Sequence, residues 1–114
     1  MADCLFCRIA AGEIPADVVA STDGALAFRD INAQAPTHVL VIPKEHFDNA
    51  AHLSHEDADL LAEVFRLAAQ VAAQEGVADE GYRLVTNTGT AAGQTVGHLH
   101  VHVIGGRPLR WPPG

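Results

Sequence analysis

The stretch GHLHVHVI at residues 97–104 alternates histidine with apolar residues, and it constrains the fold more than any other part of the chain. Side chains two residues apart in a β-strand point to the same face, about 6.6 Å from one another. His98, His100 and His102 therefore share one face of a predicted strand, and the apolar residues between them share the other. The apolar face belongs to a core, which leaves a row of imidazoles on the opposite face.

The rest of the chain predicts an α+β fold with a mostly antiparallel, five-stranded sheet. β-Branched and apolar residues typical of strands fill four further segments, VVAST at 18–22, ALAFRD at 25–30, HVLVIP at 38–43 and GYRLVTN at 81–87. The tripeptide TDG forms the turn between the first two. The tail at 105–114 is too rich in glycine and proline for regular structure.

One long and one short helix complete this prediction. Apolar residues recur at helical spacing from Ser54 to Glu75, with Ser54 and Asp57 as an opening box and Gly76 as the stop. Residues 4–11 predict the short helix, with Asp3 as its cap and Gly12 as its end.

Length and charge narrow the class of protein. A chain of 114 residues fits a single domain over 1–114. Its net charge of −7 argues against a nucleic-acid partner, because nothing here neutralises a run of phosphates. We expect no membrane partner, because no apolar run approaches the roughly 18 residues of a span. Since the opening residues lack the pattern of a signal peptide, we expect a cytoplasmic protein.

Three interpretations of the histidine strand compete. The first is a row of solvent-exposed histidines, which requires a coincidence of three in register. The second is a catalytic metal site, although such sites usually add a carboxylate or another histidine nearby. In the third, one imidazole attacks phosphorus while its neighbours orient it and stabilise developing charge. The preceding loop GQTVG, at residues 93–97, favours the third, because glycine lets backbone N–H groups approach an anion and Gln94 and Thr95 add neutral donors.

The segment GQTVGHLHVHV resembles the signature of the histidine triad (HIT) family, and the resemblance extends over nearly the whole chain. The stretches FCRIAAGEIPA, AFRDINAQAPTHVLVIPKEH, GYRLVTNTG and GGRPLRWPPG resemble its nucleotide-binding branch, the purine nucleoside phosphoramidases. This resemblance implies a homodimer in which the sheet extends across both subunits, with the tail at 105–114 at the edge of the dimer and active site. It also implies a hydrolase of purine nucleoside phosphoramidates that forms a nucleotidyl-histidine intermediate.

The same resemblance assigns roles to individual residues. His100 is the implied nucleophile, His102 contacts the phosphate, and His38 belongs to the network that orients the nucleophile. The implied nucleotide-binding residues also comprise Asn87, Gly93, Gln94 and Thr95 around the phosphate, Asp30 and Ile31 at the ribose and base, and Phe6, Phe28 and Leu40 as apolar walls. Plain core packing is the alternative for the walls. A turn-capping role is the alternative for Asp30.

Thr95 is also an implied catalytic residue, because many relatives carry a serine there whose hydroxyl is thought to assist the leaving group. Thr95 keeps the hydroxyl, but its branching at Cβ stiffens the rotamer. This leaves the preferred leaving group open. Trp111, in the tail, is implied to reach the partner's active site and help select the leaving group. Local packing is its alternative.

Cys4 and Cys7 lie one helical turn apart, so both thiolates can converge on one ion. A bare dithiol is the alternative. Zinc-binding bacterial members of the family supply two further ligands, which correspond here to His46 and His98. Four ligands leave no open position, so this Zn²⁺ is expected to be structural. An exposed, uninvolved side chain is the alternative for His46.

Two other functions remain open beside the phosphoramidase. One is a nucleotide-binding or interaction module with little turnover. The other is a catalytic zinc hydrolase that uses the triad as metal ligands.

Overall fold

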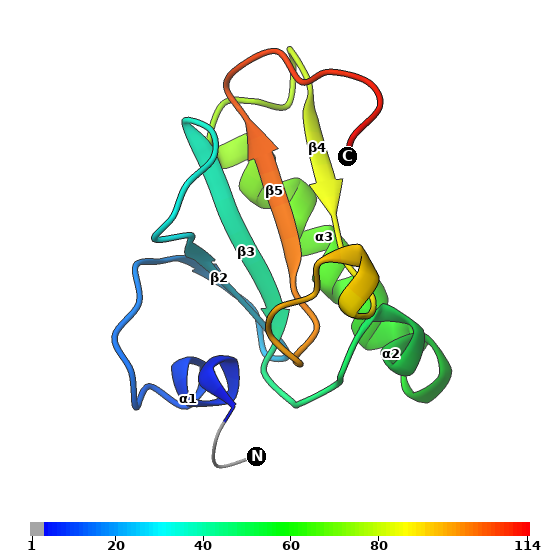
Figure 1. The fold of residues 1–114 in the computed structure, drawn as a ribbon. Helices are drawn as coiled ribbons and strands as arrows, with labels where there is room; N and C mark the ends of the chain where they lie inside the picture. Colours follow the sequence, from blue (N-terminus) through cyan, green and yellow to red (C-terminus); the bar gives the residue numbers. More distant parts are fainter. Residues whose placement is uncertain (1–3) are drawn as a thin grey trace.

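The structure is a computed structural model that describes residues 4–114. Its helices are α1 (Leu5–Ala10), α2 (Ala50–Glu56), α3 (Ala58–Gln74) and the 3₁₀ turn η1 (Thr90–Ala92). Its strands are β1 (Val18–Ser21), β2 (Ala25–Arg29), β3 (Thr37–Pro43), β4 (Tyr82–Val85) and β5 (Val101–Gly105). Figure 1 shows their arrangement. No helix within residues 4–114 has the length and apolar character needed to cross a membrane.

The strands form one sheet in the order β1-β2-β3-β5-β4, and every neighbouring pair is antiparallel. This confirms the predicted five-stranded antiparallel sheet. The two strands that carry the expected site histidines, β3 and β5, lie side by side in the middle of it, with His38 opposite Ile104 and His102 opposite Leu40. Residues that are 64 positions apart, His38 and His102, therefore come together on one face.

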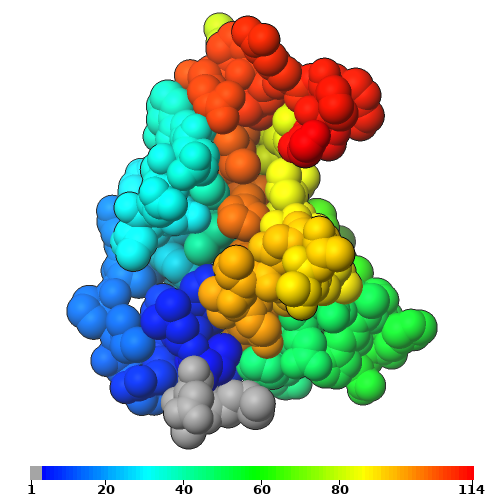
Figure 2. Space-filling view, viewed as in Figure 1, coloured from blue at the N-terminus to red at the C-terminus, as the bar shows by residue number. Residues whose placement is uncertain are grey.

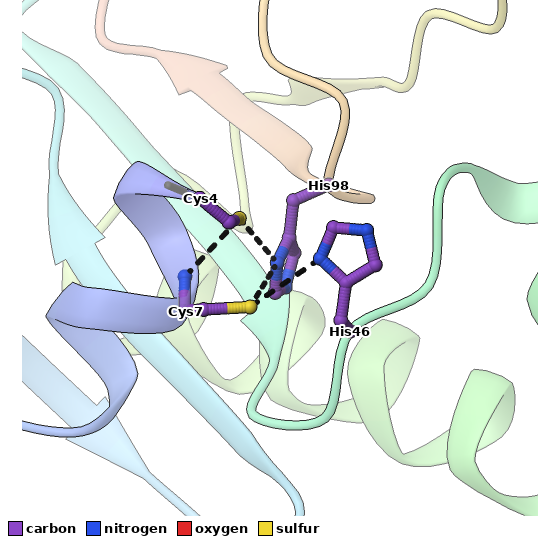
Figure 3. A group of neighbouring side chains, drawn as sticks. All are labelled: Cys4, Cys7, His46 and His98. Carbon is purple, nitrogen blue, oxygen red and sulfur yellow. Dashed lines mark hydrogen bonds between the residues drawn. The ribbon is translucent and has the colours of Figure 1, made fainter. Parts of the chain in front are cut away.

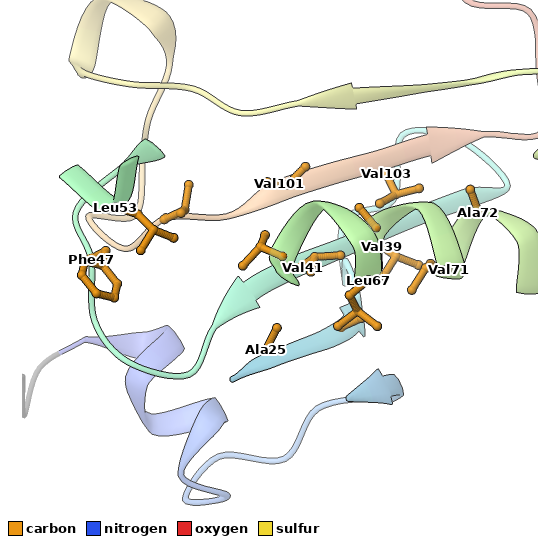
Figure 4. Packing of buried hydrophobic residues seen from close by; sticks show 14 of the residues in the cluster. Ala25, Val39, Val41, Phe47, Leu53, Leu67, Val71, Ala72, Val101 and Val103 are labelled. Carbon is orange, nitrogen blue, oxygen red and sulfur yellow. The ribbon is translucent and has the colours of Figure 1, made fainter. Parts of the chain in front are cut away.

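Alternation along the strands divides the sheet into two apolar faces. One face packs against α3, and its residues include Val39, Val41, Val101 and Val103 (Figure 4). The opposite face carries Leu26, Phe28, Leu40 and Ile42, with Phe6 of α1 packed against them. The first face is the main core. The second face holds the candidate site.

The predicted start of the long helix, at Ser54, is wrong. A separate helix, α2, begins after Asn49, whose side chain accepts a hydrogen bond from the His52 N–H. The chain leaves helical geometry at Asp57 (φ −157°, ψ 88°), and the Asp57 side chain then caps α3 by accepting from the Leu60 N–H. Ser54 lies inside α2 and donates to the Ala51 carbonyl, so it opens no helix. The predicted end at Gly76, with φ +77°, is confirmed.

The short N-terminal helix is confirmed over Leu5–Ala10, but its cap differs from the prediction. Cys4 occupies the N-cap position, and its sulfur accepts a hydrogen bond from the Cys7 N–H. The predicted cap, Asp3, lies outside the described residues. In the space-filling view, α1 lies against the loop that precedes β5 (Figure 2), where Val96 packs into the same apolar cluster as Phe6.

The histidine strand is shorter than predicted, because pairing in β5 begins only at Val101. In the register of β3 and β5, the partner of Leu99 would be Pro43, which has no N–H to donate. The carbonyl of Pro43 instead bonds the ring of His98, and the Leu99 N–H donates to the Phe47 carbonyl at 2.7 Å. His98 and His100 therefore lie on an extended segment just before the strand.

Candidate functional site

The three histidines all lie on the side of the sheet that faces away from α3. His98 is 0% exposed and His100 is 6% exposed, whereas His102 is half-buried. The residues between them, Leu99 and Val101, belong to the main core on the other side. The predicted division into two faces is therefore confirmed, and the alternative of three solvent-exposed histidines is wrong.

Four side chains converge where α1 meets the segment before β5 (Figure 3). Sγ of Cys4 lies 3.3 Å from Nδ1 of His98, and Sγ of Cys7 lies 3.3 Å from Nδ1 of His46 and 3.5 Å from Nδ1 of His98. All four of these ligand atoms lie within 4.8 Å of one another. We call Cys4, Cys7, His46 and His98 the metal cluster, because two thiols and two imidazoles at this spacing can hold a metal ion.

The hydrogen bonds of both cluster histidines leave Nδ1 available as a ligand. Nε2 of His98 lies 2.9 Å from the Pro43 carbonyl oxygen, which only accepts, so Nε2 carries the proton. Nε2 of His46 likewise donates to the Asp48 carboxylate at 3.1 Å. In each neutral ring, the lone pair then lies on Nδ1, the atom that faces the sulfurs. This arrangement is typical of metal-ligating histidines, whose other nitrogen donates to a carboxylate or carbonyl.

The pKa shifts in the cluster favour uncharged side chains. Burial, with a contribution from the neighbouring Cys4, raises the pKa of the Cys7 thiol above its usual value. Burial also lowers the pKa of His98, despite its bond to the Pro43 carbonyl, so this imidazole is held neutral. A divalent cation placed among two thiols and two imidazoles would stabilise the thiols as thiolates. The residues present therefore fit a metal ion.

His100 is held in one tautomer by the backbone of its own strand. Its Nδ1 donates to the His98 carbonyl oxygen at 2.8 Å, which leaves the lone pair on Nε2. The ring lines a pocket, and the Phe6 ring lies edge-on to it with centroids 5.1 Å apart. An imidazole with one nitrogen fixed as a donor and the other free meets the requirement for nucleophilic attack.

A second chain of hydrogen bonds orients His102. The Gln34 N–H donates to Nδ1 of His38 at 3.0 Å, so the proton of His38 lies on Nε2. This Nε2 lies 2.9 Å from Nδ1 of His102 and 3.3 Å from the Asp30 carboxylate. Because Nδ1 of His102 accepts from His38, its Nε2 carries the proton and is available as a donor.

Burial keeps the rings of His38 and His102 uncharged. It lowers the pKa of His102 to about 4, with further lowering from His100 and His38. It also lowers the pKa of His38, against an opposing contribution from Asp30. Both rings are therefore neutral near pH 7, and His102 donates as an uncharged imidazole.

Asp30, His38 and His102 also lie close enough together to surround an ion. Their hydrogen bonds do not suit one, however, because Nδ1 of His38 already accepts from a backbone N–H and its Nε2 must keep the proton. If a metal ion bound Nε2 of His38 while Nδ1 kept its hydrogen bond, both nitrogens of this ring would need a lone pair, and a neutral imidazole has only one. The two clusters therefore differ in chemistry: the first suits a metal ion, and the second suits a hydrogen-bonded acceptor.

The pocket beside these histidines has a volume of about 770 Å³, within the usual range for a small-molecule site. Nine of the sequence-predicted residues line it, namely Phe6, Phe28, Asp30, Ile31, His38, Leu40, Thr95, His100 and His102. Further apolar lining comes from Leu5 and Ile9 of α1 and from Ile14, Pro15, Ala16 and Val96, none of which the sequence singled out. Phe6, Phe28 and Leu40 are also core residues, so wall and core roles coexist.

Asp30 takes the turn-capping role and also lies beside His38. One carboxylate oxygen accepts from the Asn32 N–H at 2.8 Å, which is the turn-capping role, and the other lies 3.3 Å from Nε2 of His38. The residue is only half-buried and lines the pocket, so its carboxylate remains accessible to a ligand.

Four predicted site residues do not line this pocket: Asn87, Gly93, Gln94 and Trp111. The carboxamide of Gln94 is occupied within the protein, since its Nε2 donates to the Asp48 and Val96 carbonyls and its Oε1 accepts from the Gly89 N–H. Gly93 takes φ +89°, where a side chain would be strained, with open space where a Cβ would lie. Trp111 is 84% exposed.

Sequence reasoning missed the residues that set the tautomers. Asp48 orients His46 from two positions along the chain, and this His-x-Asp spacing is a signal that the sequence already carries. The carbonyl of Pro43 and the N–H of Gln34 have no such signal, because backbone groups act through the fold and not through residue type.

Comparison with known proteins places this geometry in a family. The model of the HIT domain matches residues 11–109. An uncharacterised HIT-like protein of Synechococcus elongatus is 52% identical over 112 residues, which cover 98% of this chain and 97% of that protein. The purine nucleoside phosphoramidase of Escherichia coli K12 is 46% identical over 105 residues, which cover 92% of this chain and 88% of that enzyme.

Solved structures agree. The crystal structure of a HIT family hydrolase from Legionella pneumophila superposes with a TM-score of 0.94 at 50% identity, covering 98% of this chain and 100% of that one. A HIT family hydrolase from Clostridium thermocellum gives a TM-score of 0.92 at 43% identity, covering 96% of each chain. From its sequence, its fold and these relatives, the chain belongs to the HIT domain family.

Proposed function

We propose that this protein hydrolyses purine nucleoside 5′-phosphoramidates through a nucleotidyl intermediate on His100. The observation that carries the proposal is the 2.8 Å bond from Nδ1 of His100 to the His98 carbonyl, which leaves Nε2 as a nucleophile beside a pocket of nucleotide size. Hydrolases among the solved relatives, and a relative named purine nucleoside phosphoramidase, support the reaction class.

The proposed reaction has two steps. Nε2 of His100 bonds to the α-phosphorus as the P–N bond to the leaving amine breaks, and the amine leaves with a proton taken from solvent. Water then attacks the same phosphorus and gives up a proton to solvent, the P–N bond to His100 breaks, and the nucleoside monophosphate leaves. The Nε2–H of His102 stabilises the charge that develops on a phosphoryl oxygen. Asp30, through His38, keeps this donor in place.

The nucleoside is proposed to occupy the apolar end of the pocket. Phe6, Phe28 and Leu40 would pack on the purine, Ile31 would cover it from the loop after β2, and Asp30 would accept from the ribose hydroxyls. Ile31 is fully exposed, so a ligand that covers it would remove apolar surface from water.

The phosphate is proposed to lie at the loop before β5, with Asn87, Gly93, Gln94 and Thr95 around it. Thr95 lines the pocket, and within residues 4–114 its backbone N–H takes part in no hydrogen bond. That N–H and the Thr95 hydroxyl are therefore suitable donors to a phosphate or leaving group. Gln94 acts differently in this proposal, because its carboxamide already supports the loop.

The metal cluster is proposed to bind Zn²⁺, which favours sulfur and nitrogen ligands in tetrahedral sites. Cys4, Cys7, His46 and His98 would fill all four positions, so the ion would stabilise the fold and would not bind substrate. The thiols must stay reduced to serve as ligands, which suits the cytoplasm.

A homodimer that continues the sheet is also part of this proposal. Within residues 4–114, β4 is an edge strand that pairs only with β5, so its outer edge can accept a second copy. The tail at 105–114 follows β5, and Arg83 of β4 donates to the Arg110 carbonyl at 2.9 Å. This contact holds the tail beside the proposed interface, where the exposed Trp111 would reach the partner's site.

The decisive experiment is mass spectrometry of the protein mixed briefly with an adenosine phosphoramidate. We expect a mass increase of one AMP in the wild type and none in His100→Ala. His55→Ala is the matched control, because His55 is an exposed histidine on α2 and lies outside the pocket. It should form the adduct as the wild type does.

Other results would favour the competing functions. AMP binding without an adduct or turnover in the wild type would identify a nucleotide-binding module. Loss of turnover on chelation, with the fold retained and the adduct absent, would identify a catalytic metal. An adduct that persists in His100→Ala would assign the nucleophile to another residue.

A further inference from the structure

We propose that the metal cluster and the nucleoside pocket are thermodynamically coupled through α1, so that occupying either one tightens the other. The inference rests on the proposed nucleotide substrate. In this inference the ion does more than stabilise the fold, because it also helps to form the pocket wall against which the purine packs.

The helix α1 contributes to both sites with adjacent residues. Cys4, at its N-cap, and Cys7 face His46 and His98 in the metal cluster (Figure 3). Phe6 lies between them in sequence and lines the pocket. A shift of α1 that moves the thiols therefore moves the pocket wall as well.

Phe6 connects α1 to the reactive end of the pocket. Its ring is 5% exposed and lies edge-on to Phe28, with centroids 5.6 Å apart, and to His100, with centroids 5.1 Å apart. Leu5 and Ile9, from the same helix, line the pocket as well. One short helix therefore supplies three apolar wall residues.

Apart from the apolar packing of Phe6, Ile9 and Ala10 against the sheet, few contacts hold α1 in place. It has only six residues, and an isolated helix of that length is unstable in water. Every backbone hydrogen bond made by residues 4–13 within the described chain stays inside that segment. The hydrogen bonds that reach another segment are those of the two thiols to His46 and His98. The apolar contacts of Phe6, Ile9 and Ala10 and the metal cluster are therefore its main anchors.

The other two metal ligands belong to the sheet side of the site. The ring of His98 is fixed by the Pro43 carbonyl at the end of β3, and that of His46 by Asp48. Loss of the ion would release α1 and leave these histidines in place. A metal ion and a nucleoside each bind the docked arrangement of α1, so each one favours the other by the same factor.

Comparing AMP with inorganic phosphate distinguishes coupling through α1 from a general effect of anions on Zn²⁺ binding. AMP occupies both the nucleoside wall and the phosphate end, whereas inorganic phosphate occupies only the phosphate end. The protein is loaded with Zn²⁺, and the release of Zn²⁺ to excess chelator is timed with AMP, with phosphate or with neither. We expect saturating AMP to slow release by at least about fivefold, the low end of typical coupling between sites, and phosphate to leave it unchanged.

Two variants form a matched pair for the same measurement. Leu5→Ala trims the wall on α1 at a residue that is 45% exposed, and Ile31→Ala trims it on the exposed loop after β2. Both should weaken AMP binding. In Leu5→Ala, the effect of AMP on Zn²⁺ release should shrink, whereas in Ile31→Ala, saturating AMP should slow release as in the wild type.

Titration of AMP into metal-loaded protein distinguishes the two proposals. If AMP does not bind, the proposed function fails, and this inference fails with it. If AMP binds and leaves Zn²⁺ release unchanged, or if phosphate slows release equally, the coupling through α1 is overturned and the proposed function stands.

Discussion

The backbone carbonyl of His98 accepts a hydrogen bond from Nδ1 of His100 at 2.8 Å, while the ring of His98 belongs to the metal cluster. One residue thus contributes to two sites with two different groups. The carbonyl fixes the tautomer of His100, and the ring faces the thiols of Cys4 and Cys7. The metal cluster therefore lies next to the proposed nucleophile, His100, without using the Nε2 atom of its ring.

The carboxylate of Asp48 should control the affinity of the metal cluster. It accepts from Nε2 of His46 at 3.1 Å and so keeps the lone pair on Nδ1. Asp48→Ala removes this acceptor, and we expect metal affinity to fall by about 10- to 100-fold, as for other partners of ligating histidines. Competition with a chromogenic chelator measures the change.

Glu45→Ala is the control for that measurement, because it removes a neighbouring exposed carboxylate for which no contact to His46 is seen among residues 4–114. It should leave affinity close to that of the wild type. Equal losses in both variants would show that overall charge, and not the orientation of His46, sets metal affinity.

Stability should fall as the pH drops from about 6.5 to about 4. Burial lowers the pKa of His102 to about 4, so the folded protein binds this proton less readily than the unfolded chain does. The stabilisation from neutral His102 is complete above the unfolded pKa and is lost on acidification. It amounts to at most about 3 kcal/mol, because solvent screens this half-buried ring. His38 shifts in the same direction through burial. Urea unfolding at several pH values measures the slope.

The variant His102→Gln keeps an acceptor for His38 but does not titrate, so its stability should depend less steeply on pH. His55→Gln, at an exposed position on α2, should keep the slope of the wild type. Comparing the variants at equal metal loading separates His102 from the metal ligands. A slope unchanged in His102→Gln would contradict the assignment.

Period-two alternation is why the histidine strand was predictable. Leu99 and Val101 needed a core on one side, and this requirement alone placed His98 and His100 on the other. The spacing of Cys4 and Cys7 similarly indicated a shared ion, and the structure places these thiols beside the expected histidines. Local spacing was sufficient for the strand, whereas the two histidines beside the thiols were expected from the family resemblance.

Longer-range choices were not visible in the sequence. Asp57 looked like the last residue of a capping box opened by Ser54, but it caps α3 itself because Asn49 had already started a helix. The two caps, Asn49 and Asp57, lie eight residues apart, and only tertiary packing decides between one helix and two. The tautomers of His38 and His98 depend on backbone groups of distant or adjoining loops, which residue identity does not encode.

Gln94 provides the last test, because the resemblance implies that it contacts phosphate whereas its carboxamide is used inside the protein. Its Nε2 donates to the Asp48 carbonyl at 2.6 Å, and its Oε1 accepts from the Gly89 N–H at 2.9 Å. Gln94→Ala should therefore destabilise the fold by about 1–2 kcal/mol and speed amide exchange in residues 88–97.

Gln94→Glu should be destabilising too, since a carboxylate keeps the acceptor for Gly89 but cannot donate to the Asp48 carbonyl. Gln70→Ala, at an exposed position on α3, is the control and should change unfolding by less than about 0.5 kcal/mol. Urea unfolding and hydrogen exchange are measured together with the KM for an adenosine phosphoramidate. If Gln94→Ala raised KM while leaving unfolding and exchange unchanged, Gln94 would be a direct phosphate ligand and not a support for the loop.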